Sequence, residues 1–205
     1  MMQNALHIEH LSADVLKVLG LYDGESYNIA AELLADENNF PAVDIIKFGD
    51  SINTILMRKT FSHISILKAF NETMDVFSDY YIYEVISGMT RKKVEAIPEE
   101  AFREALTNAF INREWDLPSS IQIAMFNDHI EITSPGGLPD GISTFAYLTN
   151  KILNFRNPKI ANVFWKTHLT NKLENGILCI KKSYNHYVRK PSFHINLNSI
   201  TVIVE

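Results

Sequence analysis

The sequence predicts an α+β fold, because helical and strand patterns are interspersed along its 205 residues and the clearest strands form antiparallel hairpins. Apolar residues make up 46% of the chain and charged residues 21%, a balance typical of a packed core and not of disorder. A polar stretch at residues 36–40 is the clearest boundary. We therefore expect a small helical N-terminal lead, residues 1–36, followed by an α+β domain, residues 37–205.

The first half of the chain begins with two short helices. Ser12 and Asn28 are favourable N-caps for them, and Gly20 suits the end of the first helix. Residues 36–41 are predicted to be a polar break between the lead and the first strand. In chain order, the expected elements are helices at 13–19 and 29–34, a mostly buried strand at 43–48, a helix at about 62–78, and β-rich segments at 80–86 and 93–97.

The second half contains the strongest hairpin pattern, in which apolar and polar residues alternate on both sides of the turn at Asn127 and Asp128. Ser143 can cap a helix, and Pro158 suits the first turn of another. The expected elements are a helix at 98–113, strands at 121–125 and 130–133, helices at 143–148 and 158–165, an apolar segment at 177–180, and strands at 192–197 and 200–204.

The helix expected at 98–113 has two distinct faces. Its apolar stripe consists of Phe102, Ala105, Leu106, Ala109 and Phe110. A polar row of Glu104, Asn108 and Asn112 follows the other side, one turn apart. A carboxylate and an amide oxygen at this spacing can hold a water and a divalent cation against a phosphate chain, but a solvated helix face has the same pattern, and both interpretations stay open.

A glycine-rich loop, residues 134–141, follows the second strand of the central hairpin. Glycine tolerates positive φ and lets backbone amides turn toward an anion. A helix that follows such a loop also points its positive end at phosphates. An ordinary turn explains the same residues, so the loop alone does not establish an anion site.

The net charge of −5 indicates no general attraction to nucleic acid or to anionic lipid. The densest basic cluster is at residues 91–93. Cys179 is the only cysteine and is expected in the core, which fits a reducing, cytoplasmic location. No segment approaches the length of a membrane span, and the seven histidines show no metal-ligand spacing.

Three sequence blocks together resemble one family: residues 98–109, 130–141 and 155–164. In order and spacing they are similar to the C-terminal region of bacterial Schlafen/AlbA-type transcriptional regulators, described as RecG-related ATP-dependent DNA helicase-like proteins. That region in turn resembles the GHKL (Bergerat) ATPase fold of gyrase B, Hsp90, histidine kinases and MutL. The resemblance implies a sandwich of helices on a mixed, largely antiparallel sheet.

The resemblance also implies a site for ATP or ADP with Mg²⁺. By this resemblance Asn108 would hold Mg²⁺ through its amide oxygen, since Mg²⁺ prefers hard oxygen ligands. Glu104 would be the catalytic residue that polarises the attacking water, because a glutamate carboxylate is ionised at neutral pH and can act as a base. The residues implied to bind the cofactor are Asn108, Asn112, Ser134, Gly136, Gly137, Gly141, Arg156 and Gly176.

The sequence departs from the family pattern at three places. Asn112-Arg113-Glu114-Trp115 stands where the regulators usually have His-Arg-Asp-Tyr. Ser134 stands where they usually have asparagine and where working ATPases read the adenine with aspartate. Glu174-Asn175-Gly176 replaces Gly-Thr-Gly, and the Glu174 charge would repel phosphates by about 1 kcal/mol or more.

These departures leave two functions open. The first is a partly degenerate, nucleotide-binding GHKL-like domain of a transcriptional regulator, for which turnover by a weak Mg-dependent ATPase stays undecided. The second is a non-enzymatic module for dimerisation or partner binding, with a surface near Phe155, Phe164 and Trp165. The expected partners are a nucleotide and a second copy of the chain. The family's AlbA-like N-terminal domain is absent from the sequence, so DNA contact is expected only indirectly, and no membrane contact is expected.

Overall fold

The computed structural model describes residues 1–149, 155–170 and 176–205. The helices are α1 Met2–Ala5, α2 Ala13–Val18, α3 Ile29–Leu34, α4 Ile66–Tyr81, α5 Glu99–Asn112, α6 Thr144–Thr149, α7 Pro158–Lys166 and α8 Gly176–Ser183. The strands are β1 Glu37–Phe48, β2 Ile55–Ile64, β3 Ile82–Ser87, β4 Thr90–Glu95, β5 Ile121–Met125, β6 Ile130–Pro135, β7 Ser192–Ile195 and β8 Ser199–Val204.

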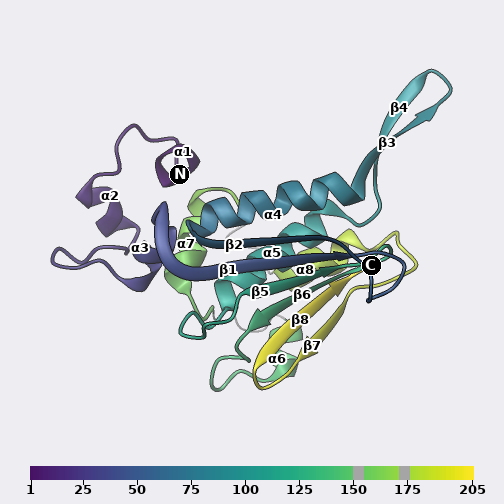
Figure 1. The fold of residues 1–205 in the computed structure, drawn as a ribbon. Helices are drawn as coiled ribbons and strands as arrows, with labels where there is room; N and C mark the ends of the chain where they lie inside the picture. Colours follow the sequence, from purple (N-terminus) through teal and green to yellow (C-terminus); the bar gives the residue numbers. More distant parts are fainter. Residues whose placement is uncertain (150–154, 171–175) are drawn as a thin grey trace.

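The main sheet has six strands in the order β2-β1-β5-β6-β8-β7 (Figure 1). Only β1 and β5 run parallel to each other, while every other neighbouring pair in this sheet is antiparallel. Helices lie against the sheet, so the predicted α+β class is confirmed. The mixed, largely antiparallel sheet with helices against it is consistent with a GHKL-like sandwich.

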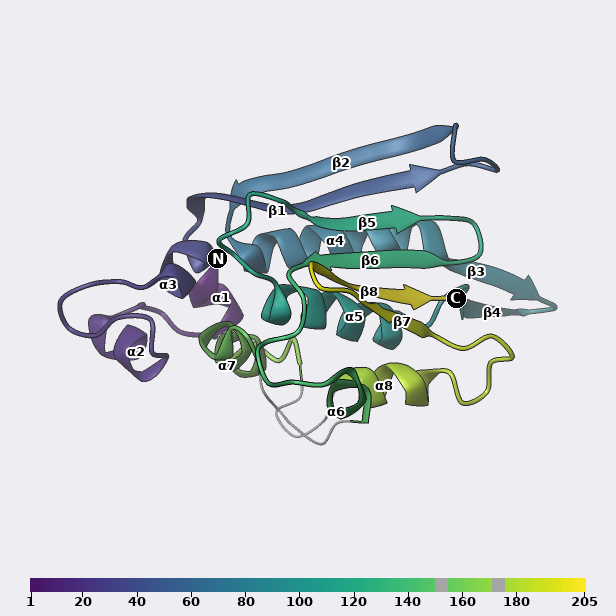
Figure 2. The ribbon, with the colours of Figure 1, turned by 90° about the horizontal axis from the view of Figure 1, so that it is seen from below.

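Helices α4 and α5 cover one face of the sheet (Figure 2). Buried and less buried residues alternate along β5 and β6, as expected for strands with one covered face. Helix α7 is fixed beside α4 and α5 by the rings of Phe70, Phe110 and Phe164, whose centroids lie 5.6 to 6.0 Å apart. Each such ring pair contributes about 0.5–1.5 kcal/mol beyond its buried area.

The helical lead packs into the same core as the sheet. Leu21, Leu33 and Leu34 are almost completely buried and belong to one apolar cluster with residues of α4 and α5. As predicted, the side chains of Ser12 and Asn28 accept hydrogen bonds from the first turns of α2 and α3. The division into residues 1–36 and 37–205 stays a prediction.

Two predictions about the first strands were wrong. The stretch 36–41 is not a break, because β1 already begins at Glu37. Pro41 is accommodated by shifts in the β1–β2 register on both sides of it. The residues before α4 form β2, not the start of a helix, and α4 begins at Ile66 instead of about 62. β2 is an edge strand with mostly exposed side chains, so it lacks the apolar alternation that identifies a strand.

A separate two-stranded hairpin, β3–β4, projects away from the rest of the molecule (Figure 1). It confirms both predicted β-rich segments and carries the basic cluster of residues 91–93 on β4. Cys179 is buried, as predicted. No helix in the described ranges combines the length and the apolar character needed to cross a membrane.

Candidate functional site

Helix α5 presents its predicted apolar stripe to the core and part of its polar row to a cavity. Phe102, Leu106 and Phe110 are buried in the core. Glu104 and Asn108 border a cavity of about 200 Å³. Glu104 is only 6% exposed, so its carboxylate is largely withdrawn from bulk water although it borders this cavity.

The cavity lies between α5, α7 and the first residue of α8. Its lining includes Glu104, Thr107 and Asn108 from α5, Pro158, Asn162 and Trp165 from α7, and Gly176. Two of the α5 atoms, Thr107 Oγ1 and Asn108 Nδ2, are buried with no hydrogen-bond partner in the part of the chain that the structure describes. A buried polar atom without a partner costs about 1–3 kcal/mol. A polar ligand in this cavity would supply the missing partners.

Gly176 lies directly against the polar row of α5. A Cβ atom at this position would lie 2.3 Å from Asn108 Nδ2 and 2.9 Å from Glu104 Oε2. Only glycine therefore fits here without moving one of the two polar side chains. The first turn of α8 is thus held close to the carboxylate and the amide that the sequence singled out.

A second, smaller hollow of about 10 Å³ lies between α5 and the strands β6 and β8. Asn108, Asn112 and Ser134 border it, so Asn108 lines both spaces. The Ser134 hydroxyl donates a hydrogen bond to the Ala109 carbonyl at 2.9 Å. Tyr147 of α6 also borders this hollow. Sequence patterns did not single it out, because its neighbours there come from α5, β6 and β8.

The three loop glycines have different surroundings. Gly136 has φ +99°, and a Cβ at Gly137 would lie 2.2 Å from the Leu197 carbonyl oxygen, so both positions are needed for close backbone packing. Gly141 has φ +79° but no neighbour within 4 Å of an added Cβ, and it borders a separate hollow near Leu197. The structure therefore does not bring Gly141 to the cavity beside Glu104.

The Arg156 guanidinium is already engaged by protein groups. It donates to the Asn112 carbonyl at 3.2 Å and to the Gly137 carbonyl at 2.8 Å, and it lies 3.5 Å from the Glu114 carboxylate. These contacts connect the end of α5 to the glycine loop. Glu174 and Asn175 of the expected phosphate loop lie outside the described residues.

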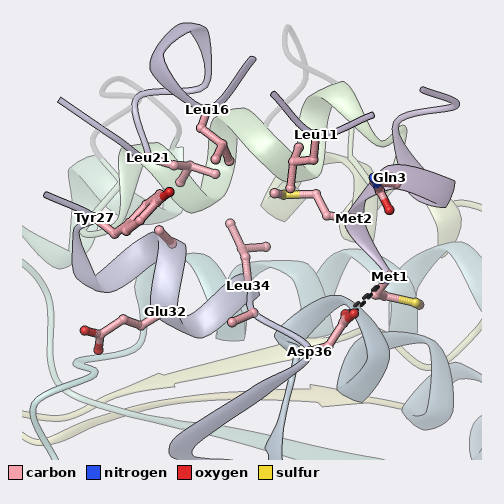
Figure 3. Close-up of a pocket in the computed structure, with 12 residues that line it drawn as sticks. Met1, Met2, Gln3, Leu11, Leu16, Leu21, Tyr27, Glu32, Leu34 and Asp36 are labelled. Carbon is pink, nitrogen blue, oxygen red and sulfur yellow. Dashed lines mark hydrogen bonds and ion pairs between the residues drawn. The ribbon is translucent and has the colours of Figure 1, made fainter. Parts of the chain in front are cut away.

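A larger hollow of about 560 Å³ lies in the N-terminal lead (Figure 3). Leu16, Leu21 and Leu34 surround it, whereas Glu32 points away. The exposed Asp36 carboxylate pairs with the terminal amine of Met1 at 3.0 Å. This hollow contains none of the predicted site residues, and its walls are mainly apolar.

The oxygen atoms of Glu104 and Asn108 beside the first cavity are suitable ligands for a hard cation. Glu104 offers carboxylate oxygens and Asn108 an amide oxygen, which are ligand types that Mg²⁺ accepts together with phosphate oxygens and water. Within residues 1–149, 155–170 and 176–205, no three His, Cys, Asp or Glu side chains come together as a metal cluster.

Comparison with known families gives the class of the C-terminal region. Residues 119–204 match the family described as "Putative ATP-dependent DNA helicase recG C-terminal". This region of the chain is therefore similar to the ATPase-like C-terminal region of RecG-related proteins. The match includes Ser134, the loop glycines, Arg156 and Gly176, whereas Glu104 and Asn108 precede it.

Among solved structures, the chain is similar to the DIP2311 protein from Corynebacterium diphtheriae, with a TM-score of 0.78 and 23% sequence identity over 95% of the chain. The chain spans 41% of the length of that protein. At this identity the similarity establishes a shared fold. Comparison with curated protein sequences found no match.

Proposed function

We propose that the chain binds ATP or ADP with Mg²⁺ in the space between α5, α7, α8 and the strands β6 and β8. The observation that carries the proposal is the placement of Glu104 and Asn108 on a cavity that Gly176 borders. Asn108 Nδ2 is buried there without a partner among the described residues, which favours a polar ligand. The ATPase-like match over residues 119–204 supports a nucleotide as the ligand.

Each polar residue has a role in this proposal. Asn108 would hold the cation through its amide oxygen, and Glu104 would orient and polarise a water for attack on the terminal phosphate. Asn112 and Ser134 border the smaller hollow, which Asn108 also lines, and would face the nucleobase there. Mg²⁺, when bound, offsets the negative charge of the phosphates during transfer.

The Ser134 and Arg156 contacts support a partly degenerate site. The Ser134 hydroxyl donates its hydrogen bond to the Ala109 carbonyl, so it can only accept a hydrogen bond from the nucleobase. Arg156 would have to exchange its two carbonyl partners to reach a phosphate. We therefore propose binding first and slow turnover second.

At the level of the whole protein, we propose a nucleotide-responsive domain of a RecG-related, Schlafen/AlbA-type transcriptional regulator. Nucleotide binding would then alter how two copies of the chain associate, and DNA would be reached through a separate AlbA-like domain. The Asn108 amide and the start of α8 are the groups whose arrangement a ligand would change, since Gly176 lies close beside Asn108.

The alternative is a partner-binding module without nucleotide. Of the three aromatic residues that suggested an interface, Phe164 is completely buried in the core. Phe155 and Trp165 are half-buried and line the cavity beside Glu104. An interface near α7 would therefore depend on these two residues alone.

Calorimetric titration of the purified chain with ATP and ADP, with and without Mg²⁺, tests the proposal. Asn108→Ala should abolish the Mg²⁺-dependent part of binding, and the matched control Asn71→Ala, an exposed asparagine on α4, should not change it. Glu104→Ala should spare binding and remove any turnover. No heat and no melting shift at millimolar nucleotide would leave the partner-binding module.

A further inference from the structure

Tyr147 borders the hollow that Asn112 and Ser134 also line. It belongs to α6, Thr144–Thr149, in which no residue is fully buried. Phe145 on the same helix is 65% exposed. Tyr147, in contrast, borders the small hollow where Asn112 and Ser134 meet, and burial raises the pKa of its hydroxyl to about 12. The Tyr147 side chain is half-buried and lies against this hollow.

The space left beside Tyr147 is too small for a nucleobase. The hollow measures about 10 Å³, which is at most the room of one water. A purine needs several times this volume. The apolar walls of the hollow, Ala105, Ala109, Ile132, Ile200 and Val202, are the flat, mostly aliphatic surroundings that a base would occupy if the tyrosine were elsewhere.

The two ends of the site thus differ in their accessibility. Beside Glu104 and Thr107 a cavity of about 200 Å³ is open, whereas beyond Asn108 only the hollow of about 10 Å³ remains. The first space suits a phosphate chain. A complete nucleotide needs both spaces, since ligand cavities for molecules of that size measure roughly 300–1,000 Å³.

We propose that the Tyr147 side chain occupies the base end of the nucleotide site, so that a nucleotide binds only when this side chain moves out. The inference rests on the proposed nucleotide function. In this proposal Tyr147 competes with the nucleobase for its space and does not compete with the phosphates. A ligand with phosphates but no base should therefore bind without displacing Tyr147.

Calorimetric titration of four chains with Mg-ATP and with Mg-tripolyphosphate tests the inference. The chains are the wild type, Tyr147→Ala, Tyr147→Phe and Phe145→Ala. Tyr147→Ala should bind Mg-ATP about tenfold more tightly than the wild type, because the competent state no longer has to exclude the ring. Its affinity for Mg-tripolyphosphate should stay unchanged. Tyr147→Phe, which keeps the ring, and Phe145→Ala, which changes an exposed ring on the same helix, should match the wild type.

The outcomes separate this inference from the proposed function. Equal Mg-ATP affinity of the wild type and Tyr147→Ala would overturn the inference and leave the nucleotide site intact. Equal tightening for both ligands would also overturn it, because the effect would not concern the base. Absence of binding of either ligand to every chain would overturn the nucleotide function and the inference together.

A measurement on the wild type decides the matter even if Tyr147→Ala does not fold. In protein labelled with fluorotyrosine, the ¹⁹F resonance that is missing from Tyr147→Phe belongs to Tyr147. Saturating Mg-ATP should move this resonance to the position of an exposed tyrosine, and Mg-tripolyphosphate should not. A resonance that stays at its buried position with bound Mg-ATP would overturn the inference.

Discussion

Replacing Gly176 with alanine tests whether the contact between α8 and α5 positions the proposed ligand groups. An added Cβ would lie 2.3 Å from Asn108 Nδ2 and 2.9 Å from Glu104 Oε2, closer than side-chain carbons approach such atoms. Gly176 is the first residue of α8 and has no positive φ, so alanine itself is not strained. The side chains of Asn108 and Glu104 must therefore move.

The expected loss of stability is small, because two opposing effects apply. Overpacking a tight contact costs typically about 1–3 kcal/mol. Alanine in a helix in place of glycine gains up to about 1 kcal/mol. Here the crowded atoms are the ends of side chains that can rotate, so the cost should lie at the low end. We expect a net loss of about 1 kcal/mol, which lowers Tm by about 2–4 °C in a chain of this size.

The expected loss of binding is larger. Displacing Asn108, the nearer of the two side chains, removes a contact to a charged ligand, and hydrogen bonds of that kind contribute about 1.5–3 kcal/mol. The affinity for Mg-ATP should therefore fall roughly ten- to hundredfold. A helix contact that merely supported the fold would change Tm and leave affinity unaltered.

Calorimetric titration together with thermal unfolding measures both effects on the same samples. Gly49→Ala is the control, because its Cβ would also meet a tight neighbour, Thr54 Cγ2 at 3.1 Å, but in the turn between β1 and β2, away from both site cavities. Gly49→Ala should retain wild-type affinity. Unchanged Mg-ATP affinity in Gly176→Ala would refute the placement of the ligand beside Asn108 and Glu104.

Two further predictions concern charged groups outside the cavity. The buried Arg113 guanidinium donates to the carbonyls of Pro41, Ala42, Leu117 and Ser119. Arg113→Met should lower the free energy of unfolding, measured by urea titration, by about 3 kcal/mol. This is the net effect of losing several hydrogen bonds from a charged donor and of no longer burying its charge. A change below about 1 kcal/mol would contradict this prediction. Hydrogen bonds from His129 and Arg189 lower the pKa of Asp128 to about 2. The ionised Asp128 carboxylate therefore stabilises the fold above its ordinary pKa of 3.8, and this stabilisation is lost as the pH falls toward 2. Asp128→Asn should lack this contribution in acid unfolding, and the exposure of the side chain limits it to below about 1 kcal/mol. Identical acid unfolding of the wild type and Asp128→Asn would contradict the prediction.

The elements that sequence predicted well have a covered face or a local signal. The β5–β6 hairpin buries one face, and α5 packs its apolar stripe into the core although Glu104 and Asn112 on its polar row are buried as well. The caps at Ser12 and Asn28 depend only on neighbouring backbone groups. β2 was missed because an exposed edge strand imposes little pattern on its side chains. The start of β1 was missed because polar residues and Pro41 are tolerated where the register shifts.

The site was only partly predictable for a different reason. Glu104 and Asn108 follow from the geometry of one helix, and the structure places both on the same cavity. The partners of Arg156 and Ser134 are backbone carbonyls of other segments, which no spacing rule identifies. Tyr147 escaped prediction because its environment comes from α5, β6 and β8 and not from its own helix.

Buried polar atoms without partners do not identify a ligand site by themselves. In the described ranges, Arg113 Nε, Trp115 Nε1 and Tyr184 Oη are also buried and unpaired, yet these residues border neither cavity of the site. Thr107 Oγ1 and Asn108 Nδ2 differ because they are adjacent on α5 and line an open space of about 200 Å³. A purely structural helix would gain stability from apolar residues there. The presence of polar groups at this turn, beside a glycine that leaves room for them, favours a ligand over a plain packing surface.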